Sequence, residues 1–131
     1  MLRKRSSSSV EVTSIERDRL LRELKGVAEQ IGSNDPTVRE VRLYGSLTTG
    51  NFTPHSDLDL LILVSTSEQG FLQRSDDYRD YFLHLPLDTD IKVYTLREIE
   101  EMRKKDNPFL REMEQKSRLI YSRSPYSHFP T

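Results

Sequence analysis

Hydrophobic residues recur along the chain with a spacing that changes from helical to strand-like and back. In residues 13–31 the apolar positions lie three and four apart, which predicts a helix. Thr13 and Glu16 match the capping-box pattern at its start, and Gly32 stands where a helix commonly ends. From Arg39 to Tyr44 apolar and polar residues alternate, which predicts a strand with one buried face.

The most apolar segment is residues 57–64, with the sequence DLDLLILV. Its density of Leu, Ile and Val predicts a central strand that is buried on both faces. Residues 71–85 have the pattern of a helix, which Pro86 would end. Residues 89–95 alternate again and predict a third strand.

The last third of the chain contains two further helix starts. Thr95 and Glu98 form a second capping-box pattern, and Asn107-Pro108 places a cap residue before a proline in the first turn of a helix that reaches about Met113. Residues 118–121 predict a fourth short strand. We therefore expect an α+β (α/β-like) fold, a mixed sheet of about four strands flanked by helices.

Composition narrows the class of protein. The 131 residues fit one domain, which we place at residues 13–122, with a flexible leader at 1–12 and a mobile tail at 123–131. The net charge is −1 and basic residues alternate with acidic ones, so a nucleic-acid groove is not expected. The absence of cysteine excludes disulfides and thiolate sites. Without an apolar stretch for a membrane span or a secretory signal, we expect a cytoplasmic protein that makes no membrane contact.

Three aspartates carry the candidate chemistry. Asp57 and Asp59 are two residues apart on a strand, so their carboxylates project from the same face and repel each other. A divalent cation relieves this repulsion, and all-oxygen ligands suit a hard ion such as Mg²⁺, with Mn²⁺ as an alternative. Asp90 opens the next strand and would provide a third carboxylate, although Asp88 has the same parity and could replace it.

Three carboxylates allow two ions to bind about 3.5–4 Å apart, which is the arrangement that stabilises an in-line phosphoryl displacement. Gly45-Ser46 follows directly after a predicted strand. Glycine lets the backbone approach a ligand closely, and a helix that began at Ser46 would present free N–H groups to phosphate oxygens. Ser56, just before the first aspartate, either contacts phosphate or forms part of a turn.

The spacing G-S-x₁₀-D-x-D, followed by an apolar strand, resembles the signature of the DNA polymerase beta-like nucleotidyltransferase superfamily. The likeness extends over residues 38–122, and the small size resembles the minimal nucleotidyltransferase branch. Members of that branch often pair with a separate HEPN-domain protein as antitoxin and toxin. The resemblance implies a fold like the polymerase beta palm and the transfer of AMP from ATP, or of another NMP from its NTP, to a hydroxyl of the partner.

The resemblance also implies roles for individual residues. Asp57, Asp59 and Asp90 would be metal ligands, with Asp90 as the base, and Gly45 and Ser46 would contact the triphosphate.

Two other functions remain open at the level of sequence. The acceptor could be a small hydroxylated molecule, as in aminoglycoside-modifying relatives, although those enzymes generally have an added helical domain. The chain could also be a non-catalytic module that only binds its partner. Because so short a chain leaves little material for an acceptor cleft, we expect a partner protein or a second copy of this chain to supply it.

Overall fold

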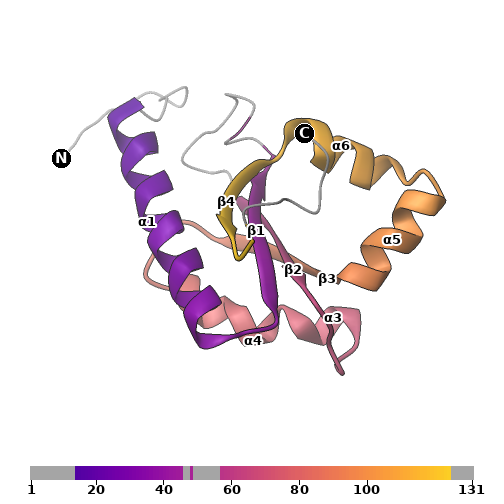
Figure 1. The fold of residues 1–131 in the computed structure, drawn as a ribbon. Helices are drawn as coiled ribbons and strands as arrows, with labels where there is room; N and C mark the ends of the chain where they lie inside the picture. Colours follow the sequence, from indigo (N-terminus) through magenta and orange to yellow (C-terminus); the bar gives the residue numbers. More distant parts are fainter. Residues whose placement is uncertain (1–13, 46–47, 49–56, 125–131) are drawn as a thin grey trace.

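In this computed structural model, residues 14–45, 48 and 57–124 are described. Four strands form one open mixed sheet in the order β3-β2-β1-β4 (Figure 1). The strands are β1 (Val38–Tyr44), β2 (Leu58–Val64), β3 (Thr89–Thr95) and β4 (Arg118–Ser122). β2 runs parallel to β3 and antiparallel to β1, which is itself antiparallel to β4. The expected fold class is confirmed.

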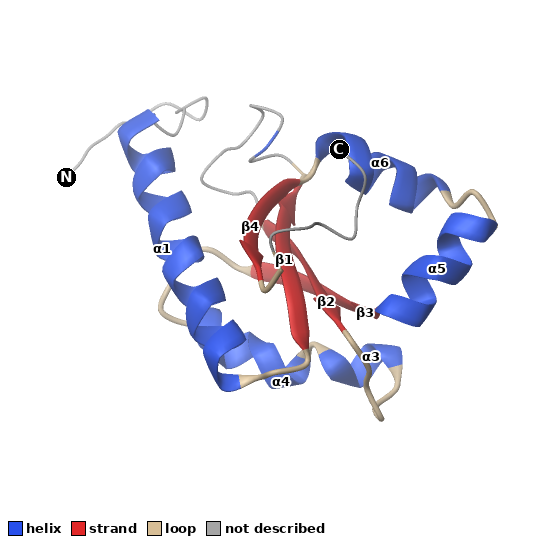
Figure 2. Ribbon diagram, in the orientation of Figure 1, coloured by secondary structure: helices blue, strands red, loops and turns tan. Residues whose placement is uncertain are grey.

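Helices cover both faces of the sheet. The long helix α1 (Ser14–Asn34) packs on one side, and α5 (Leu96–Lys104) and α6 (Pro108–Lys116) lie on the other (Figures 1 and 2). The connection from β2 to β3 contains α3 (Phe71–Arg74), α4 (Asp76–Arg79) and the 3₁₀ turn η1 (Asp80–Phe82). No helix in the described part of the chain is both long and apolar enough to cross a membrane.

β2 lies at the centre of two hydrophobic clusters. Leu60 and Ile62 face α1 and η1 in the larger cluster, while Leu61 and Leu63 face α5 and α6 in the smaller one. Alternate residues of a strand point to opposite faces, so an unbroken apolar run is buried on both. The expectation of a central strand is confirmed.

The helix predicted over residues 71–85 is divided into three short pieces. Its first piece ends at Arg74, whose side chain turns inward and donates to the carbonyls of Gln69 and Val93 at 3.0 and 3.2 Å. Ser75, Asp76 and Asp77 follow, and such residues favour caps and turns over helix interiors. The pattern of apolar residues correctly indicated the buried Tyr78, Phe82 and Leu85, but Phe71 and Leu72 are exposed and the break was not indicated.

The first helix also differs from the prediction at its end, because α1 continues through Gly32 to Asn34. Gly32 lies inside the helix, where a Cβ would overlap the ring of Tyr121 on β4. The glycine therefore permits close packing rather than ending the helix. The capping box that involves Thr13, the leader at 1–12 and the tail from residue 125 onward lie outside the described residues.

The other two predicted helix starts are confirmed. Thr95 and Glu98 exchange both hydrogen bonds of a capping box at the start of α5. Asn107 accepts hydrogen bonds from the backbone N–H groups of Phe109 and Leu110 at 2.8 and 3.2 Å, with Pro108 in the first turn of α6. These caps set where the two helices over the second face of the sheet begin.

Candidate functional site

The site begins at Gly45, which directly follows the end of β1 at Tyr44. Gly45 has a φ of +82°, and a Cβ on it would collide with the carboxylate of Asp59. The carbonyl of Gly45 accepts hydrogen bonds from the backbone N–H and the hydroxyl of Thr48 at 3.1 and 2.8 Å. The chain thus turns tightly against Asp59, which only glycine allows without strain. Ser46 lies outside the described residues.

The pairing of three strands places Tyr44, Asp59 and Asp90 in one row. Tyr44 is opposite Asp59 in the β1–β2 pair, and Asp90 is beside Asp59 in the β2–β3 pair. Tyr44 packs with the cluster under α5 and α6, and its ring lies 5.8 Å from that of Phe109. The sheet register therefore brings together two carboxylates that are far apart in the sequence.

The charges around Asp59 and Asp90 favour a cation beside these two carboxylates. Burial, and then the negative charge of Asp90, raise the pKa of Asp59. The ammonium of Lys92 lies 3.0 Å from Oδ2 of Asp90 and 5.9 Å from the ring centroid of Tyr44. Burial by itself would lower the pKa of Lys92, but the hydrogen bond to Asp90 raises it overall. A cation is thus already held beside the two aspartates.

The side chains at this site offer part of the donor set that a divalent metal ion needs. Asp59 and Asp90 supply adjacent carboxylate oxygens, and Mg²⁺ typically takes one or two carboxylates together with waters and substrate phosphates. Asp57 is exposed just before β2. No group of three or more His, Asp or Glu side chains among the described residues converges closely enough to hold an ion. The pair fits Mg²⁺ only if phosphate, water or a turned Asp57 completes the shell.

The structure also distinguishes Asp88 from Asp90. Asp88 precedes β3, and its carbonyl accepts a hydrogen bond from the backbone N–H of Leu58 at 2.9 Å. Its side chain lines a cavity with Phe82, which belongs to the cluster on the α1 side of the sheet. Asp90, not Asp88, is the aspartate in register with Asp59. Ser56, the other candidate phosphate contact, lies outside the described residues.

Two features near the aspartates are absent from the sequence motif. The hydroxyl of Tyr44 is buried, and burial raises its pKa while the neighbouring ammonium of Lys92 lowers it. A cavity of 120 Å³ opens beside Gly45 and is also lined by Tyr44, Phe109 and Met113. In the sequence, Tyr44 stands two residues after Arg42 in the alternating pattern of β1, which only weakly indicated that it lies near the aspartates. Nothing in the sequence indicated the cavity, because it is formed by the packing of α6.

Comparison with known proteins agrees with this geometry. The model of the family described as polymerase beta, nucleotidyltransferase matches residues 28–126, which include the strands that carry Gly45, Asp59 and Asp90. No curated protein matches the sequence.

Similar folds occur among solved structures. A proposed nucleotidyltransferase from Sulfolobus solfataricus is 19% identical with a TM-score of 0.58, over 89% of this chain and 94% of that one. A toxin–antitoxin structure with AMP-PNP is 18% identical with a TM-score of 0.55, over 76% and 73% of the two chains. Spectinomycin adenyltransferase from Enterococcus faecialis is 12% identical with a TM-score of 0.54, over 91% and 60%. At these identities the likeness concerns the fold.

Proposed function

This chain belongs to the polymerase beta nucleotidyltransferase family, and we propose that it transfers AMP from ATP to a hydroxyl group on a partner protein. The chain is thus a nucleotidyltransferase, and our proposal concerns which nucleotide it transfers and to which acceptor. The observation that carries the proposal is the register that sets Asp59 beside Asp90, next to the tight turn at Gly45.

In the proposed reaction the acceptor oxygen attacks the α-phosphorus of ATP. A bond forms between that oxygen and phosphorus, the bond from the α-phosphorus to the bridging oxygen breaks, and pyrophosphate leaves. Asp90 takes the proton of the acceptor hydroxyl, and Asp57, Asp59 and Asp90 would be the residues that hold Mg²⁺. The bound ions would supply positive charge against the phosphate oxygens. Gly45, Ser46 and Ser56 would contact the triphosphate, because a backbone without a side chain can approach it closely.

The choice of acceptor rests on two considerations. Among the similar solved structures is a toxin–antitoxin pair with AMP-PNP, an analogue of ATP. The resemblance to minimal nucleotidyltransferases adds a HEPN-type partner as the expected acceptor. A small-molecule acceptor is the alternative, since the fold also resembles spectinomycin adenyltransferase, of which the matched part is 60%.

The first test measures binding of Mg-ATP by the purified chain. At about a hundred times its Kd, a ligand that binds only the folded state stabilises it by about 2.7 kcal/mol. We expect thermal unfolding to show such a gain for the wild type. Asp59→Asn and Asp90→Asn should lose most of it, because each removes a charge from the adjacent pair. Asp88→Asn should keep it, since Asp88 lies outside the register.

The second test uses ATP labelled at the α-phosphate, with a lysate of the source organism. A labelled protein band with wild type, reduced by at least about a hundredfold with Asp90→Asn, supports transfer to a protein and loss of the base. Label on a small molecule instead would favour the alternative acceptor. A wild-type chain that neither binds Mg-ATP nor labels anything contradicts the proposal and leaves a partner-binding module.

A further inference from the structure

Among the described residues β3 is an edge strand of the sheet, and its outer edge is open beside Asp90. We propose that an extended segment of the acceptor protein adds to this edge at Thr89–Ile91 as a further strand, with a flanking side chain in the adjoining cavity. The proposal rests on the proposed function, because it concerns how a protein acceptor reaches the same site. Addition of a strand to a sheet edge is a common mode of peptide recognition.

The direction of the backbone groups follows from two hydrogen bonds. The carbonyl of Asp88 bonds to Leu58 on β2, whereas the carbonyl of Val93 bonds to Arg74, on the outer side. Backbone groups alternate along a strand, so those of Thr89 and Ile91 also point outward. In the described part of the chain no backbone or side-chain group pairs with them. They present two N–H donors and two C=O acceptors.

Arg74 closes the other half of this edge. It is 8% exposed, donates to the carbonyl of Val93, and forms hydrogen bonds to both carboxylate oxygens of Glu98 at 2.6 and 3.1 Å. A strand that pairs with β3 therefore cannot continue past Ile91. The open stretch is the part that borders Asp90, and unprotected edges in native proteins are usually short or covered.

An added strand would place a hydroxyl at the right position. Residues directly opposite on neighbouring strands have their Cβ atoms about 4.5–5.5 Å apart on the same face. A Ser, Thr or Tyr opposite Asp90 would thus direct its hydroxyl toward the carboxylate that we assign as the base. The residues on either side of it would point to the other face of the sheet.

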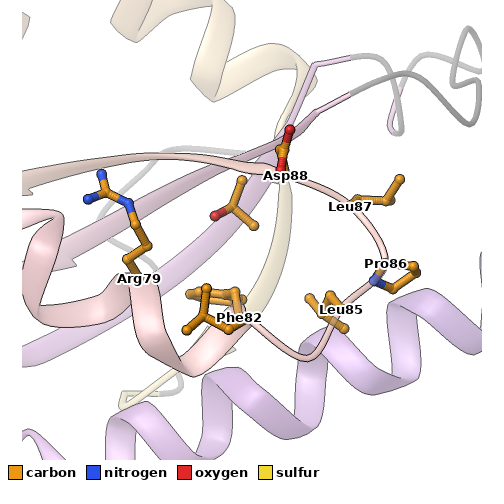
Figure 3. A pocket seen from close by; sticks show the side chains of 8 residues that line it. Arg79, Phe82, Leu85, Pro86, Leu87 and Asp88 are labelled. Carbon is orange, nitrogen blue, oxygen red and sulfur yellow. The ribbon is translucent and has the colours of Figure 1, made fainter.

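That other face holds a cavity of 410 Å³ against Thr89. Figure 3 shows the cavity between α4 and the loop that leads into β3, with Phe82, Leu85 and Pro86 along its apolar wall and Arg79 and Asp88 near its rim. Its size fits an apolar side chain next to the hydroxyl residue. The acceptor we infer is an extended peptide segment in which a hydroxyl residue is followed or preceded by an apolar residue.

Three substitutions at Thr89 distinguish the contribution of the backbone edge to acceptor binding from that of the cavity. Thr89→Pro removes one outward N–H without breaking the β2–β3 pairing, and proline is tolerated in the first residue of an edge strand. Thr89→Trp keeps the N–H and fills the cavity. Thr89→Val is the matched control, which keeps both the N–H and the shape. Each variant is assayed for Mg-ATP binding by the purified chain and for labelling of the acceptor band in the lysate.

We expect Thr89→Pro and Thr89→Trp each to lower labelling by about tenfold, the equivalent of a lost main-chain hydrogen bond or a lost pocket contact. Thr89→Val should label like the wild type, and all three should bind Mg-ATP. Wild-type labelling by both Pro and Trp variants overturns the docking proposal while the proposed function stands. If the proline variant does not fold, the tryptophan variant decides. Binding of Mg-ATP without any labelled protein also overturns it, whereas a wild type that does not bind Mg-ATP refutes the proposed function itself.

Discussion

Gly45 has no side chain, and the carboxylate of Asp59 occupies the space that a side chain would need. Its φ of +82° adds a second requirement, because this backbone conformation costs other residues about 1–2 kcal/mol. The same residue thus permits the turn after β1 and the close approach of Asp59. Gly45 of the motif therefore sets the position of the Asp59 carboxylate as well as the course of the backbone that would face a phosphate.

Gly45→Ala tests this double requirement. The added Cβ would push the Asp59 carboxylate away from Asp90, and misplacement of a reacting group by about 1 Å can lower a rate a hundredfold. We expect a loss of nucleotidyl transfer of that order, together with weaker Mn²⁺ binding measured by titration. Gly70→Ala is the control, because a Cβ there meets only the flexible amide of Gln73. Wild-type transfer by Gly45→Ala would show that Asp59 does not depend on this turn.

At the scale of elements, the Arg74–Glu98 pair joins α3 to the start of α5. Glu98 serves twice, because it closes the capping box with Thr95 and accepts from Arg74. Arg74 is the last residue of α3, and its side chain turns inward to reach Glu98 and the carbonyl of Val93. The side chain that ends α3 therefore also closes half of the β3 edge.

Glu98→Gln should lower the free energy of unfolding by about 1–2 kcal/mol at pH 7, because it weakens charged hydrogen bonds to a buried arginine. Burial alone would raise the pKa of Glu98, but the hydrogen bonds from Arg74 and Thr95 lower it below its ordinary value of 4.5. The stabilisation is therefore complete above about pH 4.5 and is lost as the pH falls through the lowered pKa. Urea unfolding at pH 7 and at pH 3–5 measures both effects.

Glu100→Gln is the matched control in the same helix. Its partner Arg103 lies 2.9 Å away and also pairs with Glu114, but the Glu100 side chain is well exposed, so the change should stay within about 0.5 kcal/mol. Equal losses for the two variants, or a Glu98→Gln loss that does not shrink on acidification, would mean that the Arg74 pair does not stabilise the fold.

At the scale of the whole molecule, the first helix and the last strand hold each other. Tyr121 of β4 packs against Gly32 of α1, and Arg123 donates to the backbone carbonyls of Gly32, Asp35 and Val38. These contacts join the end of α1 to the sheet edge opposite β3. They keep β1, whose end carries the Gly45 turn, between its two neighbours.

Gly32→Ala should destabilise the fold, because its Cβ would overlap the ring of Tyr121 and overpacking typically costs about 1–3 kcal/mol. Gly26→Ala in the same helix has nothing within 4 Å of its Cβ, so it should instead stabilise by about 0.5–1 kcal/mol. Urea unfolding of the two variants gives the comparison. If Gly32→Ala were as stable as Gly26→Ala, the contact with Tyr121 would not join the two ends of the fold.

The sequence by itself determined the elements and the residues that carry the motif. Periodicity and capping residues act within a few positions, so the strands and the starts of α5 and α6 follow from local interactions. The spacing between Gly45 and Asp59 could likewise be seen directly in the chain. The break at Ser75 was missed although Ser75, Asp76 and Asp77 favour turns, and the passage of α1 through Gly32 was missed because Tyr121, which packs against it, is far away in the sequence.

Only the tertiary structure decided which side chains meet. That Asp90 rather than Asp88 stands beside Asp59 depends on the register of β2 and β3, because a slip of two residues would keep the same face and place Asp88 there instead. Register depends on the packing of the whole sheet and cannot be derived from either strand alone. The open edge beside Asp90 also depends on the tertiary structure. It requires that β3 be at the edge of the sheet and that Arg74 of α3 contact the carbonyl of Val93.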